Sequence, residues 1–238
     1  MKIFIAGCGR SGTRLMLNLM KCFSNLYCHP VEADVAKFDE LVECPAKHLV
    51  VKRTFQCHQK LPNLPDSIEL IYCVRHPFDV LTSSMPSELF FHITPKRWLA
   101  EYQSLKELRT RQPDRSIFFS KYEELIRQPN VIQAKVAGVF GLVPIRRFNE
   151  DPENPIREMS LRKWERNLAF RLYLGRLDPT FIDRIRAISA WSLATTCQIC
   201  PTVIDPNFGI SRVHLIEDHE ANRRMGCAKR NPSRRHRQ

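Results

Sequence analysis

The chain has 238 residues and a formal net charge of +12, and 43% of its residues are hydrophobic. These values are typical of a folded protein with one α/β domain, and they exclude a disordered chain. The sequence has no run of about 18 apolar residues, which predicts that no segment spans a membrane. The first residues also lack the apolar segment of a signal peptide, so we expect a cytoplasmic protein.

The first strand and the loop after it carry the clearest signal. Residues 2–6 are predicted to form a strand and residues 13–23 a helix with one apolar face. Between them, Gly7 and Gly12 have the spacing of a nucleotide-binding phosphate loop, in which glycines let the backbone approach an anion at the helix start. That loop normally continues with a lysine and a hydroxyl residue for Mg²⁺, but this chain has Thr13 and Arg14. The loop therefore predicts a phosphate-bearing ligand and no magnesium.

Strands and helices alternate after the loop, which is the pattern of a parallel sheet. Strands are predicted at 26–28, 48–52, 68–74 and 116–119, and helices at 33–42, from Pro77, at 95–111, 121–127 and 131–140, and from 178 to 191. Residues 144–175 have no clean period and indicate either a binding lid or an irregular surface segment. The predicted fold class is α/β, with three layers in a P-loop-like fold and a central parallel sheet flanked by helices.

The end of the chain differs from the rest. We expect one domain over residues 1–210 and a flexible basic tail over 211–238, because seven Lys or Arg and no acid follow Glu220. A solvated tail is the simplest interpretation, and a contact with a polyanion is the alternative. Cys197 and Cys200 form a lone C-x-x-C without a second ligand pair, so no metal site is expected. An odd count of nine cysteines indicates reduced thiols.

A second cluster follows the strand at 68–74. Arg75 stands at the end of this strand, and Ser83 lies two helical turns further on. An arginine and a hydroxyl that share one surface are suited to binding a phosphate. An ion pair between Arg75 and Asp79 is the structural alternative.

Taken together, these segments resemble the sulfotransferase superfamily. The family's loop for the 5′-phosphosulfate resembles residues 7–15, and its 3′-phosphate motif resembles residues 75–83. Three shorter matches follow in the family's order: Tyr122-Glu123-Glu124-Leu125 with Pro129, then Phe140-Gly141-Leu142, then Arg162-Lys163-Trp164. Two positions depart from the family: Arg14 replaces the usual Thr or Ser, and His76 replaces an Asp or Asn that often caps the next helix.

The resemblance implies an enzyme that moves a sulfuryl group from 3′-phosphoadenylyl sulfate (PAPS) to a hydroxyl or amine acceptor. The residues that it implies for PAPS binding are Arg10, Ser11, Gly12, Thr13, Arg14, Arg75, Ser83, Tyr122 and Lys163. The acceptor is open, whether a small molecule, a glycan or a peptide. The oligomeric state is open as well. The alternatives are a non-catalytic protein that binds PAP, PAPS or a polyanion, and a P-loop kinase or NTPase.

Sulfuryl transfer also needs a cation at the leaving oxygen and a base for the acceptor. The candidate cations are Arg10 and Lys52, although Lys52 also fits a solvated strand end. Glu32 is the first candidate base, because it matches the catalytic glutamate of the tyrosylprotein-sulfotransferase branch. An exposed glutamate at the start of a helix is the alternative, and His58 and His29 are rival bases. Trp164 is a candidate for stacking on adenine or lining the acceptor pocket, and Phe90 and Phe91 are expected to pack in the core.

Overall fold

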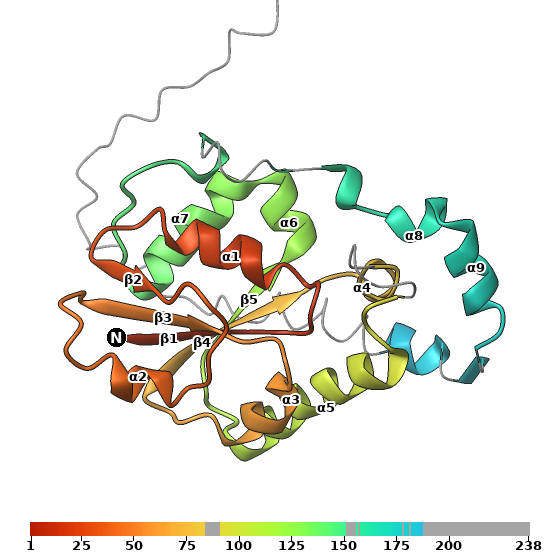
Figure 1. Ribbon diagram of the computed structural model, residues 1–238, viewed down its shortest axis with the longest axis horizontal. Helices are drawn as coiled ribbons and strands as arrows, with labels where there is room; N and C mark the ends of the chain where they lie inside the picture. The colour runs from red at the N-terminus through yellow and green to blue at the C-terminus, as the bar shows by residue number, and fades with distance from the viewer. Residues whose placement is uncertain (84–90, 151–155, 157, 178, 181, 188–238) are drawn as a thin grey trace, which may run out of the picture. The chain divides into compact units, whose positions relative to one another are not determined.

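The computed structural model describes residues 1–83, 91–150, 156, 158–177, 179–180 and 182–187. Its centre is a five-stranded parallel sheet in the order β2-β3-β1-β4-β5 (Figure 1). The strands are β1 (Lys2–Ala6), β2 (Leu26–Cys28), β3 (His48–Lys52), β4 (Ile68–Val74) and β5 (Ile117–Lys121). The predicted α/β class with a central parallel sheet is confirmed.

Side-chain alternation along the strands creates two cores. In β1, Ile3 and Ile5 pack on one face, whereas Phe4 and Ala6 pack on the other. Because successive side chains of a strand point to opposite faces, a wholly apolar strand must be covered on both sides. All five residues of β3, including His48 and Lys52, are also buried.

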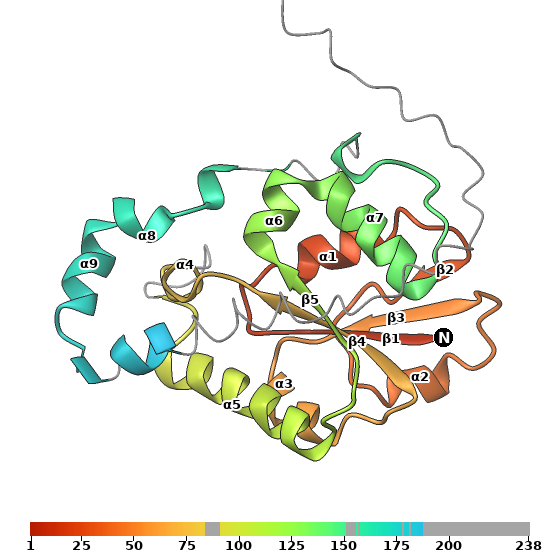
Figure 2. The same ribbon diagram turned by 180° about the vertical axis from the view of Figure 1, so that it is seen from behind.

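Helices cover both faces, and Figures 1 and 2 show the same layers from opposite sides. One face carries α1 (Thr13–Met20), α6 (Tyr122–Arg127) and α7 (Pro129–Phe140). The other carries α2 (Lys37–Glu40), α3 (Cys57–Lys60), the 3-10 turn η1 (Leu61–Asn63) and α5 (Pro95–Arg111). The remaining elements are α4 (Pro77–Leu81), the 3-10 turns η2 (Phe148–Glu150) and η3 (Glu158–Ser160), α8 (Lys163–Arg166) and α9 (Leu168–Leu174).

Some predicted boundaries differ from the structure. The first helix ends at Met20 instead of residue 23, because the chain then turns and Ile145 donates its amide to the Cys22 carbonyl, 2.8 Å away. The helix expected at 33–42 is only α2. Strand β5 runs on to Lys121, since it pairs with β4 as far as Val74.

The segment without a clean period contains short helices. Within 144–175, the described residues include η2, η3, α8 and α9, and α8 contacts α4. Asp79 of α4 anchors this segment by accepting the backbone amides of Arg162, at 2.9 Å, and Trp164, at 3.4 Å. The part of this segment around residues 162–166 therefore packs beside α4, which follows β4, whereas η2 packs on α7.

Two expectations lie wholly or partly outside the described residues. The helix expected from 178 to 191 is described only in part, and the C-x-x-C at 197–200 and the basic tail fall beyond residue 187. No helix in the described part of the chain combines the length and apolar character that a membrane crossing requires.

Candidate active site

Two glycines shape the loop between β1 and α1. Gly7 has φ +142°, and a Cβ there would lie 2.5 Å from the Cys73 carbonyl oxygen. Gly12 has φ +99°, and a Cβ there would lie 2.6 Å from the ring of Tyr122. Both the backbone angles and the close approaches require glycine. The loop is therefore packed against β4 and against Tyr122 at the start of α6.

The loop is held in a strained form between these glycines. Ser11 is buried, and its hydroxyl donates to the Cys8 carbonyl at 2.6 Å. Arg10 has φ +70°, a left-handed conformation that is costly for a side chain other than glycine and that occurs mainly at functional sites. The Arg10 carbonyl accepts a hydrogen bond from the Arg75 guanidinium at 3.1 Å. This hydrogen bond joins the first motif to the second.

Arg75 is almost fully buried at the end of β4, with 8% of its surface exposed. Its guanidinium lies 4.0 Å from the centre of the Tyr122 ring and donates to the Ser160 carbonyl. Its Nε is buried without a hydrogen-bond partner among the described residues. Burial lowers the pKa of Arg75. A buried cation with an unused donor is suited to an anionic ligand.

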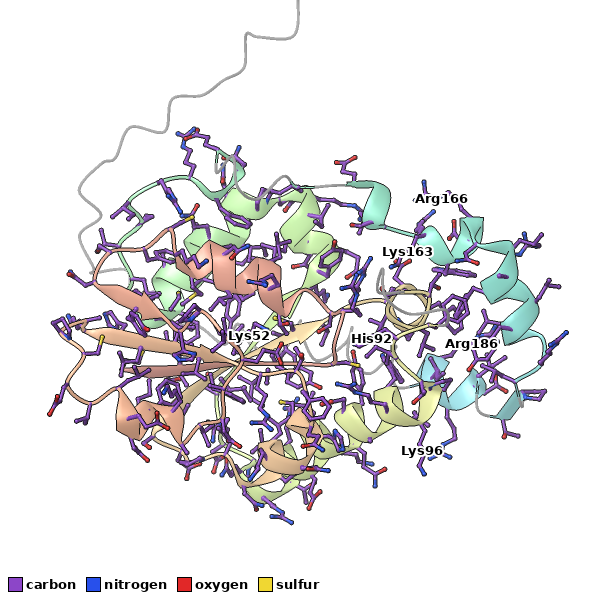
Figure 3. The ribbon with its side chains drawn as sticks, viewed as in Figure 1. Lys52, His92, Lys96, Lys163, Arg166 and Arg186 are labelled. Atoms are coloured by element: carbon purple, nitrogen blue, oxygen red, sulfur yellow. The ribbon has the colours of Figure 1, made fainter. Side chains whose placement is uncertain are left out.

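Lys163 is the second cation of this cluster. Its Nζ donates to the Ser83 hydroxyl at 2.6 Å, and that hydroxyl donates to the Asp79 carbonyl at 3.0 Å. Burial, together with the charges of Arg75 and Arg10, lowers the pKa of Lys163 to about 8. Figure 3 shows Lys163 on α8 and Lys52 near the centre of the sheet. Cations that depress one another's pKa form a site in which an anion relieves the repulsion.

The predicted ion pair between Arg75 and Asp79 is replaced by another arrangement. The Asp79 carboxylate accepts backbone amides of the 162–164 segment, while Arg75 donates to two carbonyls. Ser160, which no motif indicated, closes the cluster: its hydroxyl and the Tyr122 hydroxyl are 2.7 Å apart. Ser160 is 38 residues from Tyr122 in an irregular segment, and no sequence pattern pointed to it.

A second polar cluster surrounds Glu32. Lys52, at the end of β3, is buried, and its Nζ donates to Glu32 Oε1. The Thr54 hydroxyl donates to both carboxylate oxygens, at 2.7 and 3.0 Å, and the amides of Thr54 and Phe55 donate to Oε2. Burial acts to raise the pKa of Glu32, but the hydrogen bonds from Lys52 and Thr54 prevail and lower it to about 2. Lys52 is therefore not a solvated strand end, and Glu32 lies before α2, not within it.

A third cluster was not predicted as a unit. Glu101 on α5 is fully buried, and its Oε1 lies 3.3 Å from Nδ1 of His58 on α3. Arg97, one helical turn before Glu101, donates to the Thr54 carbonyl at 3.1 Å. Periodicity offered a signal for Glu101, because it lies on the apolar face of α5 between Trp98 and Leu105.

The other candidates have varied surroundings. Arg14 is exposed and Thr13 is buried in the first turn of α1. His29 is buried, and its Nδ1 lies 2.9 Å from the Val31 carbonyl. His76 stands at the N-cap of α4, but its side chain forms no capping hydrogen bond there; its ring stacks on Trp164 instead, with centres 5.8 Å apart and planes inclined by 4°.

The phenylalanine pair is described only in part, because Phe90 lies outside the described residues. Phe91 packs against Phe170 and Tyr173, in agreement with the expected core role. Within the described ranges, no three His, Cys, Asp or Glu side chains are arranged to hold a metal ion. The expectation that no metal is needed stays a prediction.

Comparisons with known proteins give a fold but no close relative. No protein-family model matches the sequence, and no curated protein matches it with significance. Among solved structures, the sulfotransferase domain from the curacin biosynthetic pathway superposes with a TM-score of 0.55 and 16% identity, covering 79% of this chain and 97% of that domain. A mouse sulfotransferase complexed with PAP gives a TM-score of 0.48 and 14% identity, covering 81% and 84% of the two chains. The first of these similarities shows that the chain has the fold of the sulfotransferases.

Proposed function

We propose that this chain, which has the sulfotransferase fold, transfers a sulfuryl group from PAPS to a hydroxyl acceptor. The observation that carries the proposal is the buried Arg75, whose Nε has no hydrogen-bond partner among the described residues. Beside it lies a second basic side chain, Lys163, whose pKa is lowered to about 8. This pair is positioned next to the strained loop after β1 by the hydrogen bond to the Arg10 carbonyl. Two anionic groups at the two ends of one ligand fit this arrangement.

The residues present fit a donor with a 5′-phosphosulfate and a 3′-phosphate. The loop over residues 10–13 would hold the 5′ side, since its backbone approaches closely at the start of α1. Arg75, Ser83 and Lys163 would hold the 3′-phosphate, for which an arginine, a hydroxyl and a lysine supply donors. Gly12 leaves room for Tyr122 against the loop. When bound, PAPS supplies the sulfuryl group and a phosphate leaving group.

We propose that Lys52 and Arg10 stabilise the negative charge that develops on the leaving phosphate. Lys52 is a buried cation at the end of a central strand, which is the edge where ligands bind in open α/β sheets. It is already paired with Glu32, so a donor must compete with that carboxylate for Lys52. Arg10 has an exposed side chain and is free of that restriction.

The ion pair between Lys52 and Glu32 favours one alternative, a protein that binds the nucleotide without transferring a sulfuryl group. A carboxylate with a pKa near 2 is a weak base, and Glu32 would then have a structural role only. A kinase or NTPase is disfavoured, because Thr13 and Arg14 occupy the places of the phosphate-loop lysine and hydroxyl.

The first experiment measures donor binding. Saturating adenosine 3′,5′-bisphosphate (PAP) should raise the melting temperature of the wild type by about 5 °C or more. Arg75→Gln should weaken PAP binding by roughly 10- to 100-fold, because it removes charge-assisted hydrogen bonds. Arg111→Gln is the matched control, since Arg111 forms an exposed ion pair with Glu107. If PAP leaves the wild type unchanged while ATP with Mg²⁺ stabilises it, the donor is wrong.

The second experiment measures transfer. Labelled PAPS is incubated with phenol, N-acetylglucosamine, a tyrosine-containing peptide or water alone, and PAP and labelled product are counted. Product formation with any of these supports the enzyme. PAP binding with no consumption of PAPS supports the non-catalytic alternative instead.

A further inference from the structure

Arg97 is a basic residue that no motif indicated, and it lies against the loop after β1. It belongs to the first turn of α5 and is partly exposed. A Cβ on Gly9, within that loop, would lie 3.9 Å from a terminal nitrogen of the Arg97 guanidinium. The same nitrogen donates to the carbonyl of Thr54, which follows β3, at 3.1 Å. The Arg97 side chain therefore connects the loop after β1 with the segment after β3.

The charge of Arg97 is not neutralised by a carboxylate. Among the described residues it forms no ion pair, and the Thr54 carbonyl is the one acceptor of its guanidinium. Its charge acts on Glu101, one turn further along α5, but burial raises the pKa of that carboxyl group to about 8 against this effect. Glu101 is therefore protonated at neutral pH. A guanidinium has five N–H donors, so most donors of Arg97 are left for a ligand.

Phe55 supplies an apolar surface next to this cation. It is 59% exposed, and its ring centre lies 6.0 Å from the central carbon of the Arg97 guanidinium. Its amide donates to Glu32 Oε2 at 3.3 Å, and its carbonyl accepts from Arg53 Nε at 2.8 Å. The backbone of Phe55 is thereby held on both sides. A single exposed phenylalanine is common on a protein surface, but this one stands beside an unpaired arginine.

The two side chains border the place where the sulfuryl group would be transferred. Thr54, which accepts from Arg97, also donates its hydroxyl to Glu32, the partner of Lys52 at the end of β3. Ligands of open α/β sheets bind outside this edge, where the strands end. The acceptor must approach the sulfur next to the leaving phosphate, for which Lys52 is proposed. Arg97 and Phe55 are therefore placed to contact the acceptor.

We propose that Arg97 and Phe55 bind the acceptor, and that the acceptor is a ring compound that carries a carboxylate as well as its hydroxyl group. The carboxylate accepts from the guanidinium donors of Arg97 that Thr54 leaves unused. The ring of the acceptor packs on the exposed ring of Phe55. Pockets of this kind combine an apolar wall with a few polar groups that fix orientation. This inference rests on the proposed function, because PAPS supplies the group that the acceptor receives.

The sulfuryl oxygens of the donor are the other anionic group that Arg97 could bind. That end of the donor already has Arg10 and Lys52 in the proposed function. The exposed ring of Phe55 also favours the acceptor, because sulfuryl oxygens gain nothing from an apolar surface. The two assignments differ in a measurable way: an arginine on the sulfuryl group affects every acceptor alike, whereas an arginine on the acceptor selects for charge.

The test compares acceptors that differ in a single feature. Para-hydroxyphenylacetate and its amide have nearly the same shape, and at pH 7 the phenol of each is protonated. Calorimetry measures their binding to the protein saturated with PAP, and kcat/KM is measured with PAPS. The wild type should prefer the carboxylate by about 10-fold or more, the usual size of a charge-assisted hydrogen bond. Omega-hydroxyhexanoate, which has the charge without the ring, should bind about 2- to 10-fold more weakly than para-hydroxyphenylacetate.

Variants then assign each preference to a side chain. Arg97→Gln should reduce the carboxylate-over-amide ratio to within about threefold of one, and Arg97→Lys should keep part of it because the charge remains. Phe55→Leu should remove the advantage of the ring. A melting temperature that rises with PAP shows that each variant keeps its fold and donor site. Arg111→Gln on α5 and Val139→Ala on α7, where Val139 is as exposed as Phe55, are the matched controls and should keep both ratios.

The outcomes separate this inference from the proposed function. A wild type that binds PAP but binds neither acceptor, or binds the carboxylate and the amide equally, overturns the inference and leaves the proposed function standing. If Arg97→Gln slows every acceptor alike and keeps the ratio, Arg97 serves the sulfuryl group and the inference is wrong. A wild type that does not bind PAP overturns the proposed function, and this inference with it.

Discussion

Glu32 and Glu101 each have a basic partner, yet their surroundings move their pKa values in opposite directions. Glu32 has 36% of its side chain exposed, pairs with Lys52 and accepts several further hydrogen bonds. Glu101 is wholly buried and faces His58, whose own pKa is lowered. The pKa of Glu32 falls to about 2, and that of Glu101 rises to about 8.

The difference shows what a partner must supply to keep a carboxylate charged. A lysine and several N–H and O–H donors compensate Glu32 for the water it loses. A neutral imidazole at 3.3 Å does not compensate Glu101, so the proton is retained until alkaline pH. Two carboxyl groups whose pKa values diverge in one region are typical of sites where one holds charge and the other moves protons.

The largest expected effect concerns the pH dependence of stability at Glu101. A carboxyl group with a raised pKa stabilises the folded state fully below its unfolded pKa, near 4.5, and this contribution is lost as the pH rises through about 8. The unfolding free energy of the wild type, relative to Glu101→Gln, should therefore fall by up to about 5 kcal/mol between pH 5 and pH 9. Urea unfolding of both proteins across this range measures it.

Glu107→Gln is the control for that comparison, because Glu107 is half exposed on the same helix. Its unfolding free energy should follow the wild type at every pH. Parallel curves for Glu101→Gln and the wild type would show that Glu101 is already ionised at neutral pH, and the contrast with Glu32 would disappear.

Glu32 should give a smaller effect of opposite sign. Its lowered pKa contributes stability that is present above about pH 4.5 and is lost as the pH falls toward 2. After allowance for its partial exposure, Glu32→Gln should cost about 1 to 2 kcal/mol at pH 7, about half of that or less at pH 3, and almost nothing once the pH is below about 2. Glu40→Gln, which removes an exposed ion pair with Lys37, is the control. A cost that stays constant down to pH 3 would contradict the low pKa.

The sequence predicted these two regions to different extents, for physical reasons. The loop over residues 7–12 is contiguous in the chain, so its glycines, its arginine and the strand before it could be recognised together. Glu32 and Lys52 were recognised singly, but their contact depends on the parallel pairing of Cys28 with Val50, which brings two strand ends to one edge. Glu101 and His58 are 43 residues apart on different helices, and only the packing of α3 on α5 joins them.

The fold was predicted more fully than the site. Four strands were found to within a residue, because buried parallel strands are continuous apolar runs between turn signals. The errors fall where tertiary contacts override local pattern. β5 is extended by its ladder with β4, and α9 forms in a segment where Phe170 is buried although its neighbours Leu168 and Leu172 are exposed. Such contacts cannot be inferred from the local period.

The smallest expected effect tests whether the two carboxyl groups are independent. Thr54→Val keeps the shape of the side chain and the carbonyl that Arg97 contacts, but it removes the hydroxyl that donates to both Glu32 oxygens. The pKa of Glu32 should rise by about one unit and the unfolding free energy should fall by about 1 kcal/mol, which is the usual size of one hydrogen bond. Carbon NMR of the carboxyl groups measures the first, and urea unfolding the second. The titration of His58 should stay unchanged, because the Thr54 carbonyl still anchors Arg97. If the titrations of Glu32 and His58 shift together, Arg97 couples the two clusters, and Glu32 and the His58–Glu101 pair form one proton-binding network instead of two.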